Sequence, residues 1–157
     1  MSYPSAVKIV EVGPRDGLQN ESVSLDIVTK IELIERLANT GLKYIEAGSF
    51  VSPKWVPQMA GSDEVLNQLT PSQAVYTALT PNMRGLERAM ECNVKEIAVF
   101  AAASEAFSKK NINCSIDESL AKFEALIHKA YKANIRVRGY ISCVAGCPYQ
   151  GDVDNHR

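Results

Sequence analysis

A short polar segment near the N-terminus brings together the side chains best suited to chemistry. Arg15 and Asp16 are adjacent, and Gln19 follows three residues later, all directly after the β-branched run 7–12. A carboxylate such as Asp16 is a hard oxygen ligand that suits Mg²⁺ or Mn²⁺. The neighbouring guanidinium of Arg15 can stabilise an oxyanion that develops during a reaction. Because solvated loops also contain Arg-Asp pairs, the segment predicts a site only if other elements converge on it.

Two further polar residues lie within or at the end of apolar, strand-like runs. Glu46 is an acid inside such a run, where burial is costly unless a partner compensates the charge. Tyr140 lies near the end of a later run and offers a hydroxyl to a substrate oxygen. The carboxyl ends of parallel strands meet at one end of a sheet or barrel. Together with Arg15, these residues therefore predict one site at that end, although each alone is more simply structural.

Two hydrophobic periodicities alternate along the chain and predict the elements that must position these residues. Short β-branched or apolar runs predict five strands, at 7–12, 44–47, 74–79, 96–100 and 135–142. Helical spacing of apolar residues predicts helices at 27–38, 63–69 and 83–92, and a fourth that ends near 133. The fourth helix has the clearest start, because Ser115 and Glu118 form a capping-box pattern.

This alternation predicts an α/β fold with a parallel sheet. No low-complexity linker divides the chain, so residues 1–157 are interpreted as one domain. A doubly wound sheet of five strands would be complete at this length. A (β/α)8 barrel of the TIM type needs about 250 residues, so the chain would hold only about its first five strands and four helices. Length favours the doubly wound sheet, whereas the polar strand ends favour the incomplete barrel.

Composition excludes several classes of protein. Hydrophobic residues make up 46% of the chain, charged residues 22%, and the formal net charge is −1, so neither disorder nor general binding to nucleic acid or anionic membranes is expected. No signal peptide is visible and no apolar run reaches the roughly 18 residues of a membrane span, so a cytoplasmic location is predicted. Cys143 and Cys147 are four residues apart. They fit a redox or ligand pair, or more simply two thiols of a reducing compartment.

Longer strings of the sequence closely resemble the 3-hydroxy-3-methylglutaryl-CoA lyases. They are VKIVEVGPRDGLQNE at 7–21, SFVSPKWVPQM at 49–59, KKNINCSI at 109–116 and RGYISCVAGCPY at 138–149. The resemblance extends from about residue 7 to residue 151. Isopropylmalate and citramalate synthases share the Arg-Asp pair, but they are not expected to share the string at 49–59. The lyase family is therefore preferred.

The resemblance implies a TIM-barrel lyase that depends on a divalent cation, Mg²⁺ or Mn²⁺. Such enzymes cleave 3-hydroxy-3-methylglutaryl-CoA to acetoacetate and acetyl-CoA, a step of leucine catabolism and ketone-body formation. Carried over by motif, Asp16 is a metal ligand, and Arg15 is a catalytic residue that binds substrate and stabilises the enolate oxygen. Glu46 is a catalytic acid or a partner of the catalytic residues. Gln19 and Tyr140 are implied to contact substrate.

The sequence departs from the family pattern in two places. The family uses an H-x-H pair of metal ligands, whereas this chain has only His128 and His156, which form no such pair. The string around Cys147 resembles the family's catalytic cysteine loop but belongs to an earlier position, so Cys147 is not assigned as the general acid. We therefore predict that the chain alone is inactive. The alternative is a non-catalytic half-barrel that self-associates, as a homo-oligomer, or binds a complementary chain.

Overall fold

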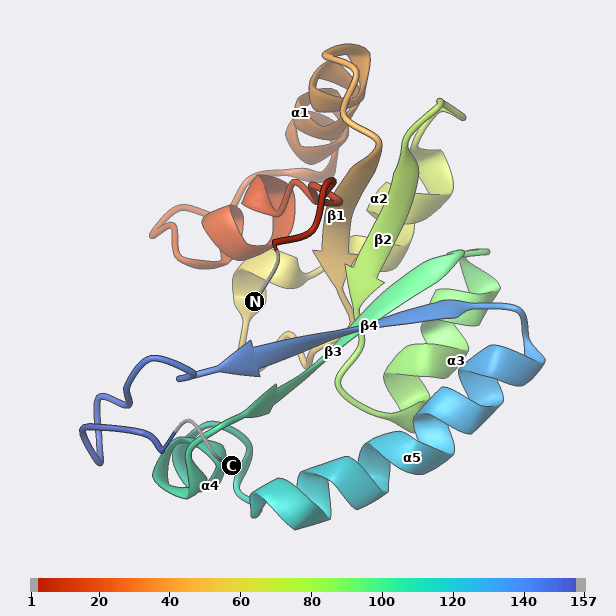
Figure 1. Ribbon diagram of the computed structural model, residues 1–157. Coiled ribbons are helices and arrows are strands. Elements are labelled where there is room, and N and C mark those ends of the chain that lie inside the picture. Colours follow the sequence, from red (N-terminus) through yellow and green to blue (C-terminus); the bar gives the residue numbers. More distant parts are fainter. Residues whose placement is uncertain (1–2, 155–157) are drawn as a thin grey trace.

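Four parallel strands, placed side by side in their chain order, form the central sheet of the computed structural model, which describes residues 3–154 (Figure 1). The strands are β1 (Tyr44–Ser49), β2 (Val75–Leu79), β3 (Glu96–Ala102) and β4 (Arg136–Ser142). The α-helices are α1 (Ile27–Asn39), α2 (Ser62–Gln68), α3 (Met83–Glu91), α4 (Glu105–Ile112) and α5 (Ile116–Lys132). Two short helical turns complete the set, the π-type η1 (Gly13–Gly17) and the 3-10 turn η2 (Pro57–Met59).

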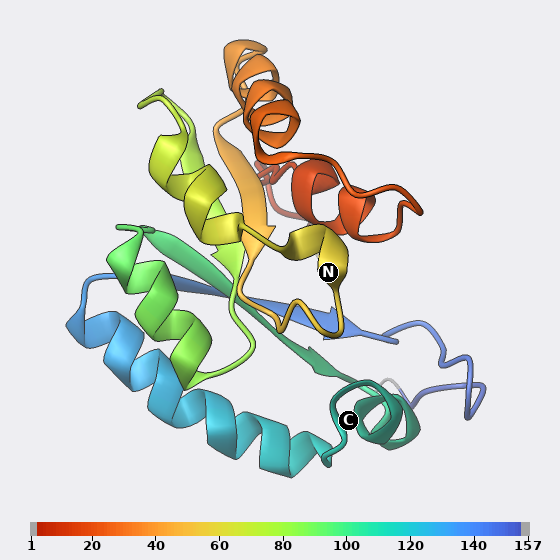
Figure 2. The ribbon, with the colours of Figure 1, turned by 180° about the vertical axis from the view of Figure 1, so that it is seen from behind.

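The strand order shows which type of α/β fold this sheet belongs to. Every strand pairs in parallel with its sequence neighbour, and the order never reverses. A doubly wound sheet requires a reversal and helices on both faces, whereas a (β/α)8 barrel has neither. Seen from behind, α2, α3 and α5 lie in front of the strands (Figure 2). The sheet is therefore an open, incomplete barrel wall with its helices on the outside.

Two apolar clusters hold the helices against the outer face of the sheet. Ile34 of α1 and Val65 of α2 are buried with Ile45 of β1 in the first cluster. The second joins α3 and α5 to the later strands, with Leu86 and Leu126 among its fully buried side chains. Burial of each such side chain contributes roughly 1.5–3 kcal/mol. The apolar positions that predicted these helices are therefore the ones that attach them to the sheet.

The predicted capping box at the start of α5 is confirmed. The backbone N–H of Glu118 donates to Ser115 Oγ at 3.1 Å, and the backbone N–H of Ser115 donates to Glu118 Oε2 at 2.8 Å. The pair satisfies two backbone donors that the first turn of a helix leaves without partners. It fixes where α5 begins and so how this helix lies along β3 and β4.

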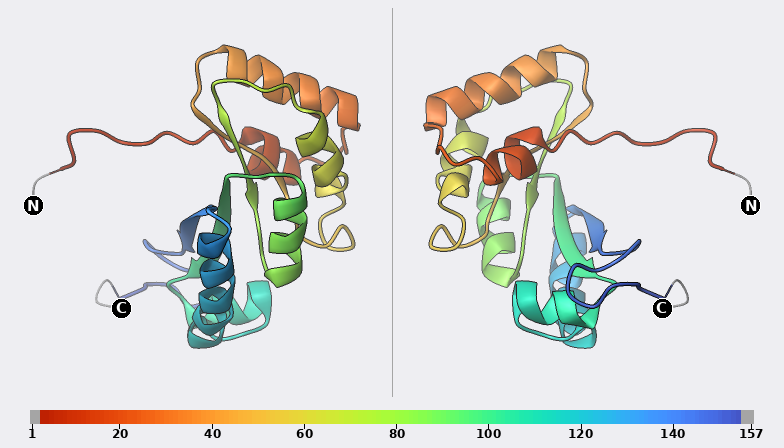
Figure 3. Two further views of the ribbon diagram at one scale, coloured as in Figure 1. Left: turned by 90° about the vertical axis from the view of Figure 1, so that its right-hand side faces the viewer. Right: turned by 90° about the vertical axis from the view of Figure 1, so that its left-hand side faces the viewer.

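The prediction of a strand at 7–12 is wrong. Within that run only Glu11 pairs with the sheet, as a single bridge to Ile45 of β1. Val7 and Ile9 are 76% and 69% exposed, and this N-terminal arm runs outward from the body (Figure 3). Among the described residues, β1 is the one strand beside this arm. The β-branched pattern is present, but no second strand or helix covers its side chains, so the pairing with β1 does not continue beyond Glu11.

The structure also differs from the prediction in its helices. Helix α4 was not predicted, because its sequence has little amphipathic character. Its start is nevertheless encoded, since Ser104 Oγ accepts a hydrogen bond from the backbone N–H of Phe107 at 3.1 Å. No helix within residues 3–154 is long and apolar enough to cross a membrane.

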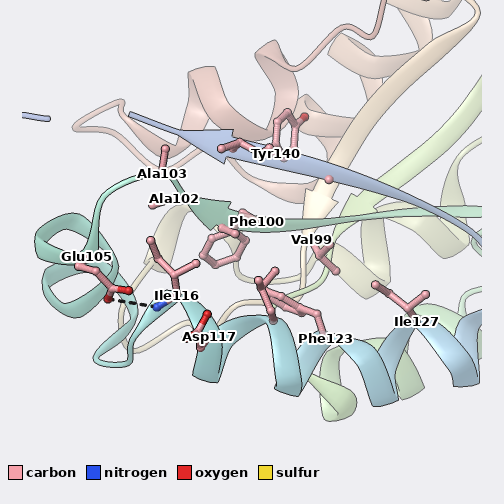
Figure 4. A pocket seen from close by; sticks show the side chains of 14 residues that line it. Val99, Phe100, Ala102, Ala103, Glu105, Ile116, Asp117, Phe123, Ile127 and Tyr140 are labelled. Carbon is pink, nitrogen blue, oxygen red and sulfur yellow. Dashed lines mark hydrogen bonds between the residues drawn. The ribbon is translucent and has the colours of Figure 1, made fainter. Parts of the chain in front are cut away.

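An apolar groove lies along the outer face of β4 (Figure 4). It has a volume of about 610 Å³ and runs between β3–β4 and α5. Phe123 and Ile127 of α5 form one wall, and Gly139 and Ile141 of β4 form the other. Ile141 is 64% exposed. The groove is thus an apolar surface that no described element covers.

Candidate active site

A cavity of about 800 Å³ opens at the carboxyl ends of the strands. The loops after β1 and β2 and the last residues of β3 and β4 contribute to its wall. Four of the residues predicted from the sequence also line it: Arg15, Asp16, Gln19 and Tyr140. The fifth, Glu46, lies beneath the floor with no exposed surface. The structure therefore brings all five predicted residues to one place.

Arg15 owes its position to the tight turn η1, which follows the bridge residue Glu11. Pro14 occupies the start of η1, and the backbone N–H of Asp16 donates to Val12 O at 2.7 Å. The turn folds the chain back over the end of β1, and Arg15 is left only 7% exposed. Its side chain is consequently directed into the protein rather than into solvent.

Two carboxylates fix the Arg15 guanidinium. Its Nε donates to Glu46 Oε1 at 2.5 Å, and its Nη1 donates to Asp16 Oδ1 at 2.7 Å. Burial alone would lower the pKa of Arg15, but the charge and hydrogen bond of Glu46, helped by Asp16, raise it overall. The cation is therefore permanently charged and held in one orientation, which is what stabilising a developing negative charge requires.

Glu46 is the centre of a buried polar cluster. Besides Arg15, its carboxylate accepts hydrogen bonds from Arg138 Nη2 at 2.6 Å and from the Tyr140 hydroxyl at 3.0 Å. Three donors from two distant segments thus surround one acid that has no exposed surface. Such a group is compensated as a buried charge, but it is not free to approach a substrate. In this structure Glu46 positions Arg15 and does not line the cavity.

The Tyr140 ring lies close to two guanidinium groups. The Cζ atoms of Arg138 and Arg15 are 4.6 and 5.6 Å from its ring centroid. Burial raises the pKa of Tyr140, and the nearby Glu46 carboxylate adds to this, while Arg138 partly opposes it. The phenol therefore stays neutral and remains a hydrogen-bond donor at physiological pH. Tyr140 is part of the cavity wall together with Arg15.

Two polar groups of the cavity wall are not fully partnered. The buried Oε1 of Gln19 has no hydrogen-bond partner among the described residues. Asp16 is half exposed, so one side of its carboxylate faces solvent even though Arg15 holds it. A buried acceptor without a partner is costly. Gln19 therefore has an unsatisfied acceptor beside the cavity, although that oxygen is itself covered.

The residues present do not fit a complete metal site. Between residues 3 and 154, no group of three or more histidine, cysteine, aspartate and glutamate side chains could hold an ion. Asp16 is the one carboxylate in the cavity wall. His128 is exposed on α5, on the outer layer of helices, and His156 lies outside the described residues. Asp16 alone supplies too few of the six oxygen ligands that Mg²⁺ prefers.

Arg138 is the main site residue that sequence reasoning missed. It lies two positions before Tyr140 in β4, and residues two apart in a strand point to the same face. That spacing would have identified it, because a basic residue beside Tyr140 is the natural partner for the buried acid Glu46. Asn82 and Asn111 also line the cavity, but no pattern distinguished them from loop asparagines. Asn82 already accepts a hydrogen bond from the backbone N–H of Gly85 as the cap of α3.

Comparison with known proteins places this geometry in context. A family model described as HMGL-like matches residues 6–156. The chain is 62% identical over 149 residues to hydroxymethylglutaryl-CoA lyase of Pseudomonas mevalonii, an alignment that covers 94% of this chain and 50% of that protein. The chain therefore spans about half the length of the curated relatives it matches.

Solved structures show the same relation. The hydroxymethylglutaryl-CoA lyase of Pseudomonas aeruginosa superimposes with a TM-score of 0.92 at 59% identity, covering 96% of this chain and 51% of that one. A lyase from Acinetobacter baumannii, solved in complex with coenzyme A and 3-methylmalate, gives a TM-score of 0.90 at 34% identity, covering 99% and 52%. The open wall of four strands therefore matches about half of TIM-barrel structures of this type.

Proposed function

Since this chain belongs to the HMGL-like family, we propose that it builds the first part of the active site of a hydroxymethylglutaryl-CoA lyase. The reaction is the retro-Claisen cleavage of 3-hydroxy-3-methylglutaryl-CoA to acetoacetate and acetyl-CoA. The observation that carries the proposal is the fixed, buried guanidinium of Arg15 in the wall of a cavity at the strand ends. The identity of 62% to a named lyase supports the choice of substrate.

The roles of the residues follow from the chemistry of that cleavage. A base removes the proton of the C3 hydroxyl, the bond between C2 and C3 breaks, and the electron pair on C2 becomes the enolate of acetyl-CoA. Arg15 faces the enolate oxygen and stabilises its charge. Glu46 holds Arg15 in place and keeps its orientation from changing as the charge develops. Gln19 and Tyr140 contact the substrate on either side of Arg15.

The divalent cation, Mg²⁺ or Mn²⁺, belongs to the same proposal. Such an ion would supply a Lewis acid that lowers the pKa of a coordinated hydroxyl. Among the described residues only Asp16 is suited to hold it, and its other ligands must come from outside residues 3–154. We therefore expect the 157-residue chain alone to release no measurable acetoacetate. Clear release that depends on Mg²⁺ or Mn²⁺ would contradict this expectation.

A chimera tests the proposal directly. Residues 6–156 would replace the matching segment of the Pseudomonas mevalonii lyase, and acetoacetate release would be measured with the same substrate. We expect an active chimera, and in it Arg15→Lys should lower kcat about 10²- to 10³-fold, because an ammonium cannot reproduce the fork of donors. Arg36→Lys, an exposed change on α1, is the matched control. A folded but inactive chimera, or equal activity in both variants, would overturn the proposal.

A further inference from the structure

A second buried carboxylate, Glu96, lies on the inner face of the sheet and has no role in the reaction proposed above. It is the first residue of β3 and is only 2% exposed. Its register partner in β2 is Thr77, which is also the register partner of Glu46 in β1. Residues in register on neighbouring strands share one face of a sheet. Glu46 and Glu96 therefore face the same interior, two strands apart.

Arg138 connects the two acids. It lies in β4, and β2 and β3 separate that strand from β1, which holds Glu46. Its terminal Nη2 donates to Glu46 Oε2 at 2.6 Å, while its Nε, closer to the backbone, lies 3.5 Å from Glu96 Oε1. Both atoms of the second contact are buried, and neither has a hydrogen-bond partner among the described residues. The Arg138 side chain therefore crosses the interior with its middle beside one carboxylate and its end on the other.

Glu96 is itself held by two other cations. Lys8 Nζ donates to Glu96 Oε2 at 2.7 Å and lies 3.6 Å from the centroid of the Tyr44 ring. Arg136 Nε lies 3.4 Å from the same oxygen. These cations compensate the buried charge and occupy Oε2, so Oε1 is the oxygen that faces Arg138. The Glu96 carboxylate is thus fixed in place and is not free to follow a movement of Arg138.

Charges of alternating sign lead from Glu96 to the cavity. Arg138 contacts both Glu96 and Glu46. Glu46 uses its other oxygen, Oε1, to accept from Arg15 Nε in the cavity wall. Without the charge of Glu96, Glu46 is the only carboxylate among the described residues that remains to Arg138, and two guanidinium groups then compete for it. Arg15 would lose the single orientation that stabilising an enolate oxygen requires.

We propose that Glu96 is a positioning residue for Arg15, acting through the two side chains between them. The inference rests on the proposed lyase reaction, in which Arg15 stabilises the charge that develops on the enolate oxygen. Glu96 is not part of the cavity wall. It keeps the Arg138 side chain extended, so that one oxygen of Glu46 is left to Arg15. Loss of its charge should therefore weaken binding of the transition state and leave binding of the substrate unchanged.

The chimera with the Pseudomonas mevalonii lyase tests this role in turnover. Glu96→Gln should lower kcat about tenfold and change KM less than about twofold, because a displaced catalytic group loses transition-state stabilisation first. Glu96→Asp keeps the charge and should lose only about threefold in kcat. Glu87→Gln is the matched control and should keep kcat unchanged, since Glu87 accepts from Lys129 at 2.7 Å between the outer helices α3 and α5.

A double-mutant cycle separates positioning from general damage to the fold. If Glu96 acts through Arg15, Glu96→Gln should lower kcat by no more than about a further twofold once Arg15→Lys is present. The inference is overturned if Glu96→Gln leaves kcat unchanged, or if the same tenfold loss appears in both backgrounds. If Glu96→Gln does not fold, the cycle is measured with Glu96→Asp, whose effect should likewise disappear beside Arg15→Lys. A chimera that is inactive before any substitution overturns the proposed function instead.

NMR of the 157-residue protein measures the order of Arg15 without the reaction. Its Nε–H is buried and donated to Glu46, so it should give a signal that exchanges slowly with water. Arg15→Lys removes this signal and so assigns it. Glu96→Gln should speed the exchange at least about tenfold, whereas Glu87→Gln should leave it unchanged. Equal exchange in the wild type and Glu96→Gln would overturn the inference whatever the chimera does, so the inference and the proposed function can fail separately.

Discussion

The two faces of β4 differ in how completely their side chains are partnered. On the inner face, Arg138 and Tyr140 both donate to Glu46, so this buried carboxylate finds its partners within this chain. On the outer face, Gly139 and Ile141 line an apolar groove that nothing described covers. The scaffold of the site is thus a property of the first strands, although the chain spans only about half the length of its relatives. What remains incomplete is the burial of apolar side chains on the outer face.

The largest expected effect comes from removing the charge at the centre of the inner face. Glu46→Gln removes the buried charge that Arg15 and Arg138 share and leaves each with one weaker carboxylate partner, Asp16 or Glu96. This should cost about 3–5 kcal/mol of the free energy of unfolding. Urea denaturation of the 157-residue protein measures it. Glu32→Gln is the matched control, since Glu32 pairs with Arg36 on the surface of α1 and should cost about 0.5 kcal/mol at most. Equal effects of the two variants would show that the inner face is not organised by Glu46.

A smaller effect, of about 1 kcal/mol, is expected from Tyr140→Phe, which removes one hydrogen bond to Glu46. This variant should also change how the free energy of unfolding falls at alkaline pH. The pKa of Tyr140 is raised in the folded protein, so its contribution is fully present below the unfolded value of about 10 and is lost as the pH rises further. The urea concentration at the midpoint of unfolding should therefore fall less steeply with pH in Tyr140→Phe than in the wild type. The relevant interval is about pH 8 to 11, where phenols titrate. Tyr131→Phe, exposed on α5, should retain the wild-type slope.

The smallest effect on stability is expected on the outer face. Ile141 is exposed, so Ile141→Lys should change the free energy of unfolding by no more than about 0.5 kcal/mol. If copies of the chain associate through the groove, the same change should lower their sedimentation coefficient at high concentration. Val28→Lys, at a similarly exposed position on α1, is the control. If Ile141→Lys lowered the free energy of unfolding by well above 1 kcal/mol, roughly twice the usual effect of a surface substitution, the outer face would already be covered.

Much of the architecture could be predicted because its determinants are local. The apolar spacing of 27–38 and the capping box at Ser115 lie within single elements, and both predictions are confirmed. The alternation of strands and helices similarly predicted the parallel sheet. The strand at 7–12 could not be judged in this way, because a strand needs neighbours that the local sequence does not describe. Helix α4 was missed for the opposite reason, since its cap at Ser104 is clear but its apolar face is weak.

The residues of the candidate site also differ in whether a local sequence pattern can place them. Arg15, Asp16, Gln19 and Tyr140 could be placed together because each lies at the end of a predicted strand. The position of Glu46 beneath the cavity, and its bond to Arg138, depend on the register between strands that are far apart in the sequence. No local pattern contains that register. The family resemblance supplied the roles of these residues, and those roles stay predictions until the chimera is measured.

The strand order also bears on how the protein acquires its structure during synthesis. Each strand pairs with the one made before it, so the wall can grow as the chain emerges, by contacts of modest sequence separation. The Glu46 cluster breaks that pattern, because Arg138 and Tyr140 follow Glu46 by 92 and 94 residues. Until β4 docks, the acid retains only the partner from η1. The ionic contact between Glu46 and Arg138 therefore forms only when all four strands have reached their correct places.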